Sequence, residues 1–280
     1  MDIENMRAFV TVAERASISQ AAADLHHLQS NMTAKIKKME AYYEQELFDR
    51  HPNGVQLTEA GETLYEQFQQ ILLLWQETEK KMGKGEEHLR VGTMISMGGD
   101  MIAPALEVLY QAYPNLTVTF KTGSTEELEA WVAKGELDIA YVIGALHQPT
   151  IYYEEAGKDE MVIIGKNIPS DADVYTYLDG KDMITLSSQC LYFSTLAQAY
   201  TKYHLKQGKI IEVSDFDTLV GFSTIGMGLA VVSKHVAHRY HITNYLEIPA
   251  PYNTINVYRI HRGKHVFSAI ERQFLEQMPS

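Results

Sequence analysis

The chain has 280 residues, of which 45% are hydrophobic and 21% are charged, and its formal net charge is −12 at pH 7. This length predicts two or three folding units, and the composition is that of an ordinary globular protein. A single cysteine excludes an internal disulfide and fits a reducing cytoplasm. No apolar run is long enough to cross a bilayer, and the N-terminal segment lacks the basic and apolar parts of a secretory signal.

The first two predicted helices are short. Apolar residues recur at helical spacing over residues 3–14, and the pattern breaks at Ala16. A second helix is expected over residues 20–25, where Ser17 or Ser19 can cap its first turn. Three consecutive alanines in this helix allow another helix to approach closely.

A third helix is predicted over residues 30–43, with Met32, Ile36 and Met39 facing inward. Its outer face is polar and basic and carries Asn31, Thr33, Lys35, Lys37 and Lys38. Two short helices joined by a tight turn, the second basic on its outer face, form a helix-turn-helix pattern. Residues 1–57 hold six Lys/Arg and eight Asp/Glu, a net charge of −2, so this pattern and not bulk charge indicates DNA binding.

A hairpin and a long helix follow. Asn53-Gly54 between apolar residues is a strong hairpin signal, and a hairpin directly after a recognition helix is a wing. Thr58 can cap the long helix. Its apolar seam predicts pairing with a second chain, although the seam could instead pack on its own domain. The seam residues expected to dimerise are Leu64, Phe68, Ile71 and Trp75.

From residue 89 onward, strand-like runs alternate with helices, which predicts an α/β domain. The runs cover residues 89–92, 116–121, 137–143, 151–156, 161–165, 183–186, 210–213, 229–233 and 254–262. The helices are expected to end near residue 113, to cover 124–134 and 191–205, and to begin at residues 215 and 266.

The residues also resemble a known family. The first 61 positions are similar, without a gap, to the DNA-binding head of LysR-type regulators. The run Leu47-Phe48, Arg50, Gly54-Val55 and Leu57-Thr58-Glu59-Ala60-Gly61 carries most of this resemblance. Other matching positions are Phe9, Glu14, Ser17, Ala21, Ala22, Leu25, His26, Gln29, Ile36 and Glu40, and weaker matches continue through Tyr113-Pro114 and residues 135–140.

The resemblance implies a multidomain fold. A mainly α winged helix-turn-helix head is expected at residues 1–58, and a linker and dimerisation helix at 59–86. An α/β effector domain of the two-lobed, type 2 periplasmic-binding-protein kind is expected at 87–280. Lobe I would hold about 87–158 and 262–280, and lobe II about 159–261. The expected protein is a cytoplasmic transcription regulator, associated with the nucleoid when bound to DNA, that forms dimers or tetramers.

The resemblance also implies which residues of the head contact double-stranded DNA. The third helix would enter the major groove, with base contacts near its start and phosphate contacts from Lys37 and Lys38. Two departures from the family pattern are Ser30, where Pro is usual, and Leu28, where a capping Ser is common, so Ser30 is expected to cap this helix. The full expected set is Ser19, Gln20, Gln29, Ser30, Asn31, Thr33, Lys35, Lys37, Lys38, Arg50, His51 and Asn53.

A small effector is expected to bind between the lobes. The resemblance places three segments there, and these are Thr93, Ser96 and Met97, then Ser124 and Thr125, then Ser187, Ser188, Gln189 and Cys190, with Thr218 nearby. Hydroxyls and amides at helix starts suit a small organic acid, yet ordinary helix caps look the same in sequence. The segment after Cys190 lacks an Arg that related sequences carry, so a more apolar metabolite is also consistent.

The single cysteine and a group of histidines could in principle form a redox or a metal site. Cys190 lies near the reactive cysteine of peroxide-sensing relatives, but the chain has no second cysteine to resolve a sulfenic acid, so a structural thiol is favoured. His235, His238, His241, His261 and His265 lack the other residues of a metal motif, and surface histidines are expected.

No nucleophile elbow, P-loop or dinucleotide fingerprint is present, so neither catalysis nor a cofactor is expected. One alternative stays open. It is a constitutive DNA-binding regulator whose regulatory domain is either degenerate or a redox sensor that uses Cys190. A solute-binding protein or an enzyme fused to a DNA-binding head is disfavoured by the missing signal and catalytic motifs.

Overall fold

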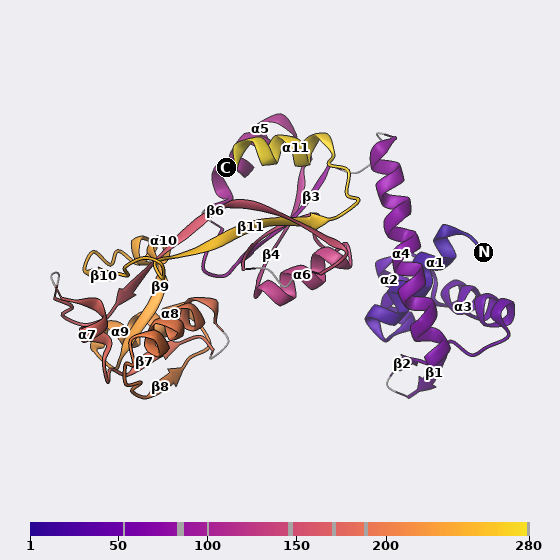
Figure 1. Cartoon of the computed structure of the whole chain (residues 1–280). Coiled ribbons are helices and arrows are strands. Elements are labelled where there is room, and N and C mark those ends of the chain that lie inside the picture. The colour runs from indigo at the N-terminus through magenta and orange to yellow at the C-terminus, as the bar shows by residue number, and fades with distance from the viewer. Residues whose placement is uncertain are drawn as a thin grey trace. The chain divides into compact units, whose positions relative to one another are not determined.

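The computed structural model describes residues 1–52, 54–82, 87–99, 101–144, 148–169, 172–187 and 190–278. It divides into two compact units, Met1–Glu86 and Glu87–Ser280, and each is described by itself (Figure 1). Among the described residues, no helix is both long enough and apolar enough to cross a membrane.

The first unit, here called the head, contains four helices and a hairpin in the described residues. The helices are α1 (Ile3–Arg15), α2 (Ile18–Asp24), α3 (Gln29–Tyr43) and α4 (Glu59–Lys81), and the hairpin joins β1 (Phe48–His51) to β2 (Gly54–Leu57). Side chains cap three of these helices. Asp2 accepts a hydrogen bond from the Asn5 amide, Ser17 from the Gln20 amide, and Thr58 from the Gly61 amide. The predicted helices, wing and Thr58 cap are therefore confirmed.

The expectation that Ser30 caps the third helix is wrong. Helix α3 begins at Gln29, and Leu28 occupies the capping position in extended conformation without a side-chain hydrogen bond. Ser30 therefore lies inside the first turn, where its side chain is exposed. The helix thus begins one residue earlier than the predicted start at residue 30.

An aromatic cluster forms the centre of the head. Phe9 of α1 contacts Phe48 of β1 and Phe68 of α4, with ring centroids 5.0 and 5.6 Å apart. Phe68 is 2% exposed. Gly54 lets the hairpin approach the α1–α2 break, because a Cβ there would lie 2.3 Å from the Ala16 carbonyl oxygen. The first half of α4 thus belongs to the core of the head.

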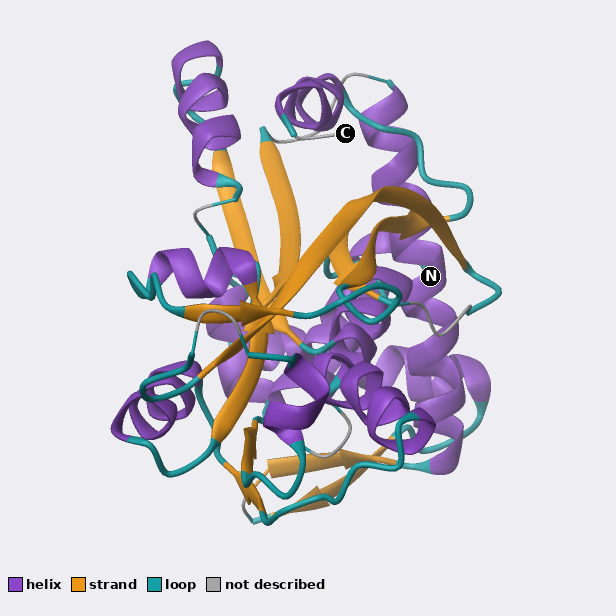
Figure 2. Ribbon diagram, turned by 60° about the vertical axis from the view of Figure 1, so that its left-hand side comes forward, coloured by secondary structure: helices purple, strands orange, loops and turns teal. Residues whose placement is uncertain are grey.

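The second unit, here called the regulatory unit, contains two groups of strands joined by two long ones. One group is β4-β3-β5 (Thr117–Gly123, His88–Met94, Ile139–Ile143), which are parallel. The other is β9-β7-β8 (Leu229–Ser233, Met183–Thr185, Ile210–Glu212), also parallel. Strands β6 (Ile151–Ile164) and β11 (Thr254–Arg262) pair antiparallel and connect them (Figures 1 and 2). Each group with its helices is one lobe.

The helices of the first lobe are α5 (Ala103–Ala112), α6 (Thr125–Ala133) and α11 (Ala269–Gln277). Those of the second are α7 (Val174–Leu178), α8 (Leu191–Lys202), α9 (Phe216–Ile225) and α10 (Lys234–Arg239), with β10 (Tyr245–Glu247) beside β6. The very short elements α7, α10 and β10 were not predicted, because three to six residues carry little periodicity.

One strand replaces two predicted ones. The charged segment Lys158–Asp159–Glu160 interrupts the apolar pattern, so residues 151–156 and 161–165 were expected to form separate strands. The structure has a continuous β6 with a bulge where Gly157 pairs with Val257. Between the two lobes the strand is not covered on both faces, so it tolerates charge there. The expected lobe boundary at residue 159 falls inside this strand.

Candidate functional site

The start of helix α3 presents polar side chains to solvent. Gln29, Ser30 and Asn31 are exposed, and the half-buried Thr33 donates its hydroxyl proton to the Gln29 carbonyl at 2.9 Å. At the start of α2, Ser19 and Gln20 are also exposed. These side chains include the amides that pair well with base edges.

The cationic groups of the head fall into two classes. Lys35 lies 3.4 Å from Glu4, and Arg50 lies 3.3 Å from Glu40, so each is partly neutralised by an acid of its own chain. Lys37 and Lys38 are exposed on α3. At the wing, His51 is exposed, whereas Asn53 lies outside the described residues. Lys37 and Lys38 are therefore the stronger candidates for phosphate contacts.

The apolar seam of α4 divides into a buried and an exposed part. Phe68 packs in the core of the head and Leu64 lies half-buried against that core. For Phe68 the expected dimer contact is therefore corrected, because little of its surface is left for a second chain. Ile71 and Trp75 are 40% and 43% exposed, and Leu74, which sequence reasoning missed, is 62% exposed.

A cavity of about 350 Å³ opens in the regulatory unit where β6 and β11 connect the lobes. Its lining residues come from the loop after β3, from β5, from the two connecting strands and from the start of α10. They are Met97, Met101, Tyr141, Ala156, Gly157, Lys158, Asp159, Ser233, His235 and Val257. Met97 was expected there from the sequence, and the others were missed.

Three residues join the lobes at this cavity. Tyr192 of α8 places its hydroxyl 2.6 Å from Asp159 Oδ2 and 3.0 Å from Ser96 Oγ. Its single proton goes to the charged acceptor, Asp159. Arg239 of α10 donates to the Ser96 carbonyl oxygen at 2.6 Å. Ser96, buried as its 3% exposure shows, therefore connects the first lobe to two helices of the second.

The other predicted effector residues are engaged in local structure. Thr93 is fully buried. Ser124 forms a capping box with Glu127, and the Thr125 hydroxyl donates to the Ile143 carbonyl at 2.8 Å. Thr218 donates to Asp215, which caps α9, and lies on a separate shallow depression. None of these four residues lines the cavity, and the hydrogen bonds of Ser124, Thr125 and Thr218 each stay within one lobe.

The segment around Cys190 is described only in part. Ser187 is exposed and its carbonyl accepts the Thr185 hydroxyl, while Cys190 precedes α8 as its N-cap without a side-chain hydrogen bond. Ser188 and Gln189 lie outside the described residues.

Burial sets the protonation of the cavity groups. It raises the pKa of the Asp159 carboxyl, while the hydrogen bond from Tyr192 and the nearby His235 act in the opposite direction. Burial raises the pKa of Tyr141 to about 12, against the effect of Arg259. The hydroxyl of Tyr141 therefore keeps its proton at neutral pH and is available as a donor.

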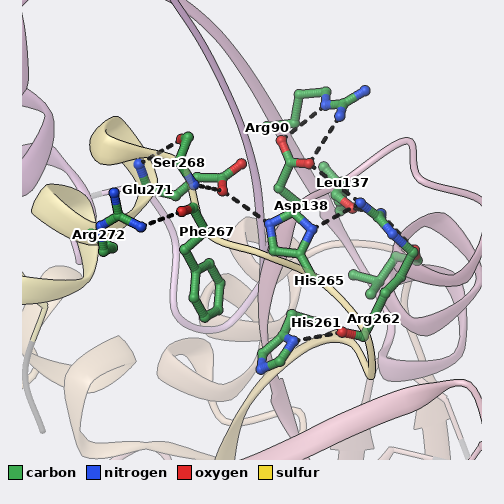
Figure 3. A network of polar contacts seen from close by, with 11 residues as sticks. Arg90, Leu137, Asp138, His261, Arg262, His265, Phe267, Ser268, Glu271 and Arg272 are labelled. Atoms are coloured by element: carbon green, nitrogen blue, oxygen red, sulfur yellow. Dashed lines mark hydrogen bonds and ion pairs between the residues drawn. The ribbon is translucent and has the colours of Figure 1, made fainter. Parts of the chain in front are cut away.

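A second polar cluster lies in the first lobe, away from the cavity lining (Figure 3). Arg90 binds the buried Asp138 through two hydrogen bonds of 3.0 and 2.9 Å. His265 stands between Arg262 at 3.0 Å and Glu271 at 2.9 Å. The expectation of surface histidines is thus wrong for His261 and His265, which are each 8% exposed, whereas His235, His238 and His241 are exposed.

Asp138, His265 and Glu271 are close enough to hold a metal ion, but their partners oppose one. The Nδ1 atom of His265 faces a guanidinium donor and must accept, so its Nε2–H donates to Glu271. Both ring nitrogens are thereby occupied, and two guanidinium groups already supply the positive charge. The cluster fits a structural ion-pair network that fastens α11 to the sheet.

Comparison with known proteins gives consistent matches. The family described as bacterial regulatory helix-turn-helix protein, lysR family, matches residues 3–62, and the LysR substrate binding domain matches residues 83–279. The HTH-type transcriptional regulator CzcR of Bacillus anthracis is 26% identical over 282 residues, covering 99% of this chain and 96% of CzcR. GltR of Bacillus subtilis strain 168 is 28% identical and covers 84% and 81%.

Solved structures show the same fold at lower identity. A full-length OxyR variant from Pseudomonas aeruginosa superposes with a TM-score of 0.74 at 18% identity, covering 99% of this chain and 97% of OxyR. Full-length CbnR in complex with its target DNA gives a TM-score of 0.65 at 16% identity, covering 99% and 98%. With both family domains matched along almost its whole length, the chain belongs to the LysR family of transcriptional regulators.

Proposed function

We propose that this regulator binds a specific double-stranded DNA site through two heads, and that a small molecule in the cavity of the regulatory unit controls that binding. The observation that carries the control is the position of the cavity. The cavity lies on the two strands that connect the lobes, and residues of both lobes line it. A ligand that fits one lobe arrangement better than another shifts the protein toward that arrangement.

The DNA contacts divide by chemistry. Gln29 and Asn31, exposed at the start of α3, suit adenine edges in the major groove. Lys37 and Lys38 suit phosphates, which fix the position of the head without reading sequence. At the wing, Arg50 and His51 contact the DNA backbone or the minor groove. Arg50 then gives up part of its ion pair with Glu40.

Pairing of two chains is supported by the exposed part of α4. The helix has 23 residues, and its apolar side chains Ile71, Leu74 and Trp75 are exposed to solvent. They are therefore not part of the core of the head. A second chain covering this surface would bring two heads to one palindromic site. The structural neighbour CbnR, solved in complex with its target DNA, supports the DNA-binding part of the proposal.

The test is fluorescence anisotropy of the full chain with the intergenic DNA beside its own gene and with scrambled DNA of equal length, across a salt series. Selective binding that weakens as salt rises is the expected result. Repeating the titration with pooled metabolites then measures effector control. Equal weak affinity for every DNA, including sites selected from the genome with metabolites present, would contradict the proposal. Selective binding that no metabolite changes would leave a constitutive regulator.

A further inference from the structure

We propose that the effector of this chain carries a cationic amino group, which pairs with the Asp159 carboxylate in the cavity, and an apolar body that packs on Met97 and Met101. This inference rests on the proposed effector control and narrows its ligand class. It replaces the small organic acid expected from the helix starts, because the hydroxyls of Ser124, Thr125 and Thr218 are engaged in local structure.

The first argument is the unpaired charge of Asp159. Among the described residues, Asp159 accepts one hydrogen bond, from Tyr192, and forms no ion pair with a Lys or Arg side chain. Its neighbour Glu160, by contrast, is exposed and is paired with Lys234 at 3.0 Å. Burial disfavours the charged form of Asp159 and raises its pKa. A ligand ammonium would supply a counter-charge at this carboxylate, with which no Lys or Arg among the described residues forms an ion pair.

The second argument is the direction of the neighbouring cation. Lys158 also lines the cavity, but along β6 it pairs with Asn256 while Asp159 pairs with Ile255, so the two side chains point to opposite faces of the sheet and do not face each other. Asp159 shares its face with Val257, which lines the cavity. His235 also lines the cavity, is exposed, and is near enough to lower the pKa of Asp159.

The third argument is a buried hydroxyl in the same cavity whose proton has no acceptor. Tyr141 is 2% exposed, and its hydroxyl lies beside Arg259, the residue opposite it on β11, whose guanidinium can donate to the hydroxyl oxygen but cannot accept its proton. The Tyr141 proton therefore has no acceptor among the described residues. A buried donor without a partner is costly, so it marks a place where a bound molecule supplies an acceptor. The cavity therefore offers an acceptor at Asp159 and a donor at Tyr141.

Apart from Lys158, Ser233 and His235, the remaining lining is apolar. Met97 and Met101 bring flexible thioether side chains that adapt to irregular shapes, and a Cβ on Gly157 would meet no atom within 4 Å. The volume of about 350 Å³ suits a small metabolite. A primary amine with a short branched or aromatic tail has the chemistry that these walls recognise.

The test uses three probes of matched shape with the full-length protein. Leucine carries an amine and a carboxylate, 3-methylbutylamine only the amine, and 4-methylpentanoate only the carboxylate. Binding is measured by calorimetry and by the thermal shift of the protein at neutral pH. We expect millimolar or tighter binding of at least one of the two amines, and at least about tenfold weaker binding of the acid, the cost of losing one charged hydrogen bond.

The variants locate the amine. Asp159→Asn keeps the shape of the side chain and its hydrogen bond to Tyr192, and it is expected to weaken amine binding at least about tenfold. Glu160→Gln, one residue along the same strand, is the matched control and should leave binding unchanged. Unaltered far-UV circular dichroism and melting of both variants without probe exclude misfolding.

Preferential binding of the acid, binding of none of the amines at millimolar concentration, or equal binding by Asp159→Asn would overturn the amine proposal. These outcomes differ from failure of effector control. If pooled acids and neutral metabolites change DNA binding while amines do not, the cavity controls the protein and only the ligand class is wrong. If amines bind through Asp159 and DNA binding never responds, the ligand class stands and the control is wrong.

Discussion

The head and the regulatory unit both have apolar cores, but among the described residues only the regulatory unit also buries charged side chains. The centre of the head is aromatic, with Phe9, Phe48 and Phe68 in contact, and its polar residues lie outside on α3. The regulatory unit buries charge, with Asp138, Arg262 and Glu271 inside the first lobe and Asp159 at the cavity. A head that reads DNA needs its polar groups exposed, whereas a ligand-binding unit needs some of them enclosed and aimed.

The largest expected effect tests the charge network of the regulatory unit. Asp138→Asn should leave Arg90 and Arg262 without their buried counter-charge and destabilise the regulatory unit by about 3–5 kcal/mol. Urea unfolding of the full chain measures this loss. Lys121→Ala, which removes a surface pair with Glu136, is the control and should cost no more than about 1 kcal/mol. Equal losses of unfolding free energy in the two variants would mean that the buried network stabilises the unit no more than a surface ion pair does.

The matching test in the head is Phe68→Ala. Removing this buried ring should destabilise the head by about 3–5 kcal/mol, through lost burial and the cavity left behind. Trp75→Ala on the same helix should change the stability of the folded head little and should weaken association of chains instead. Sedimentation equilibrium beside urea unfolding separates the two. Loss of association in Phe68→Ala with unchanged stability would restore Phe68 as a dimer contact.

A smaller effect is expected at the DNA surface. Asn31→Ala should weaken binding to the selected site by about 1–3 kcal/mol and leave binding to scrambled DNA unchanged. Lys38→Ala should weaken binding to both DNAs and lower the slope of log K against log salt by about one. Anisotropy titrations give both quantities. If Asn31→Ala weakened both DNAs alike, the side chain would contact phosphate and not a base.

The smallest expected effect is a pH dependence of the regulatory unit. Burial lowers the pKa of His261, while its hydrogen bond to the Arg262 carbonyl opposes this. Because the folded pKa is below the unfolded value of about 6.5, the contribution is present above that pH and is lost as the pH falls through the folded pKa. His261→Gln should therefore reduce the loss of stability between neutral and mildly acidic pH. An unchanged difference in melting temperature between the two pH values would contradict this assignment.

The two units also differ in how far the sequence predicted them. The contact surface of the head comes from one continuous motif, so residues 29–38 could be read from helical spacing and the family pattern. The single error there, the cap at Ser30, arose because helix starts depend on one or two residues. The apolar seam of α4 was predicted wrongly at Phe68. Spacing alone does not show whether an apolar residue packs on its own chain or on a second chain, and Phe68 packs on its own chain.

In the regulatory unit the strand order of the chain was largely predictable, but the cavity was not. Met97, Tyr141, Asp159 and His235 come from four separate elements, and no local pattern links them. The charged stretch of β6 was interpreted as a break because a strand that connects two lobes is not buried like one inside a sheet. Polar residues at helix starts were predicted to line the cavity instead. Of these, Ser124 caps α6, whereas the hydroxyls of Thr125 and Thr218 donate to Ile143 and Asp215.

The most direct test of the central claim joins the two units in one measurement. The affinity of the full chain for its selected DNA site is determined by anisotropy with and without 3-methylbutylamine or leucine, whichever binds more tightly, in the wild type and in Asp159→Asn. The account predicts that the amine changes the wild-type affinity about fivefold or more and leaves the variant unaffected. An unchanged wild-type affinity at saturating amine, or the same change in both proteins, would contradict it.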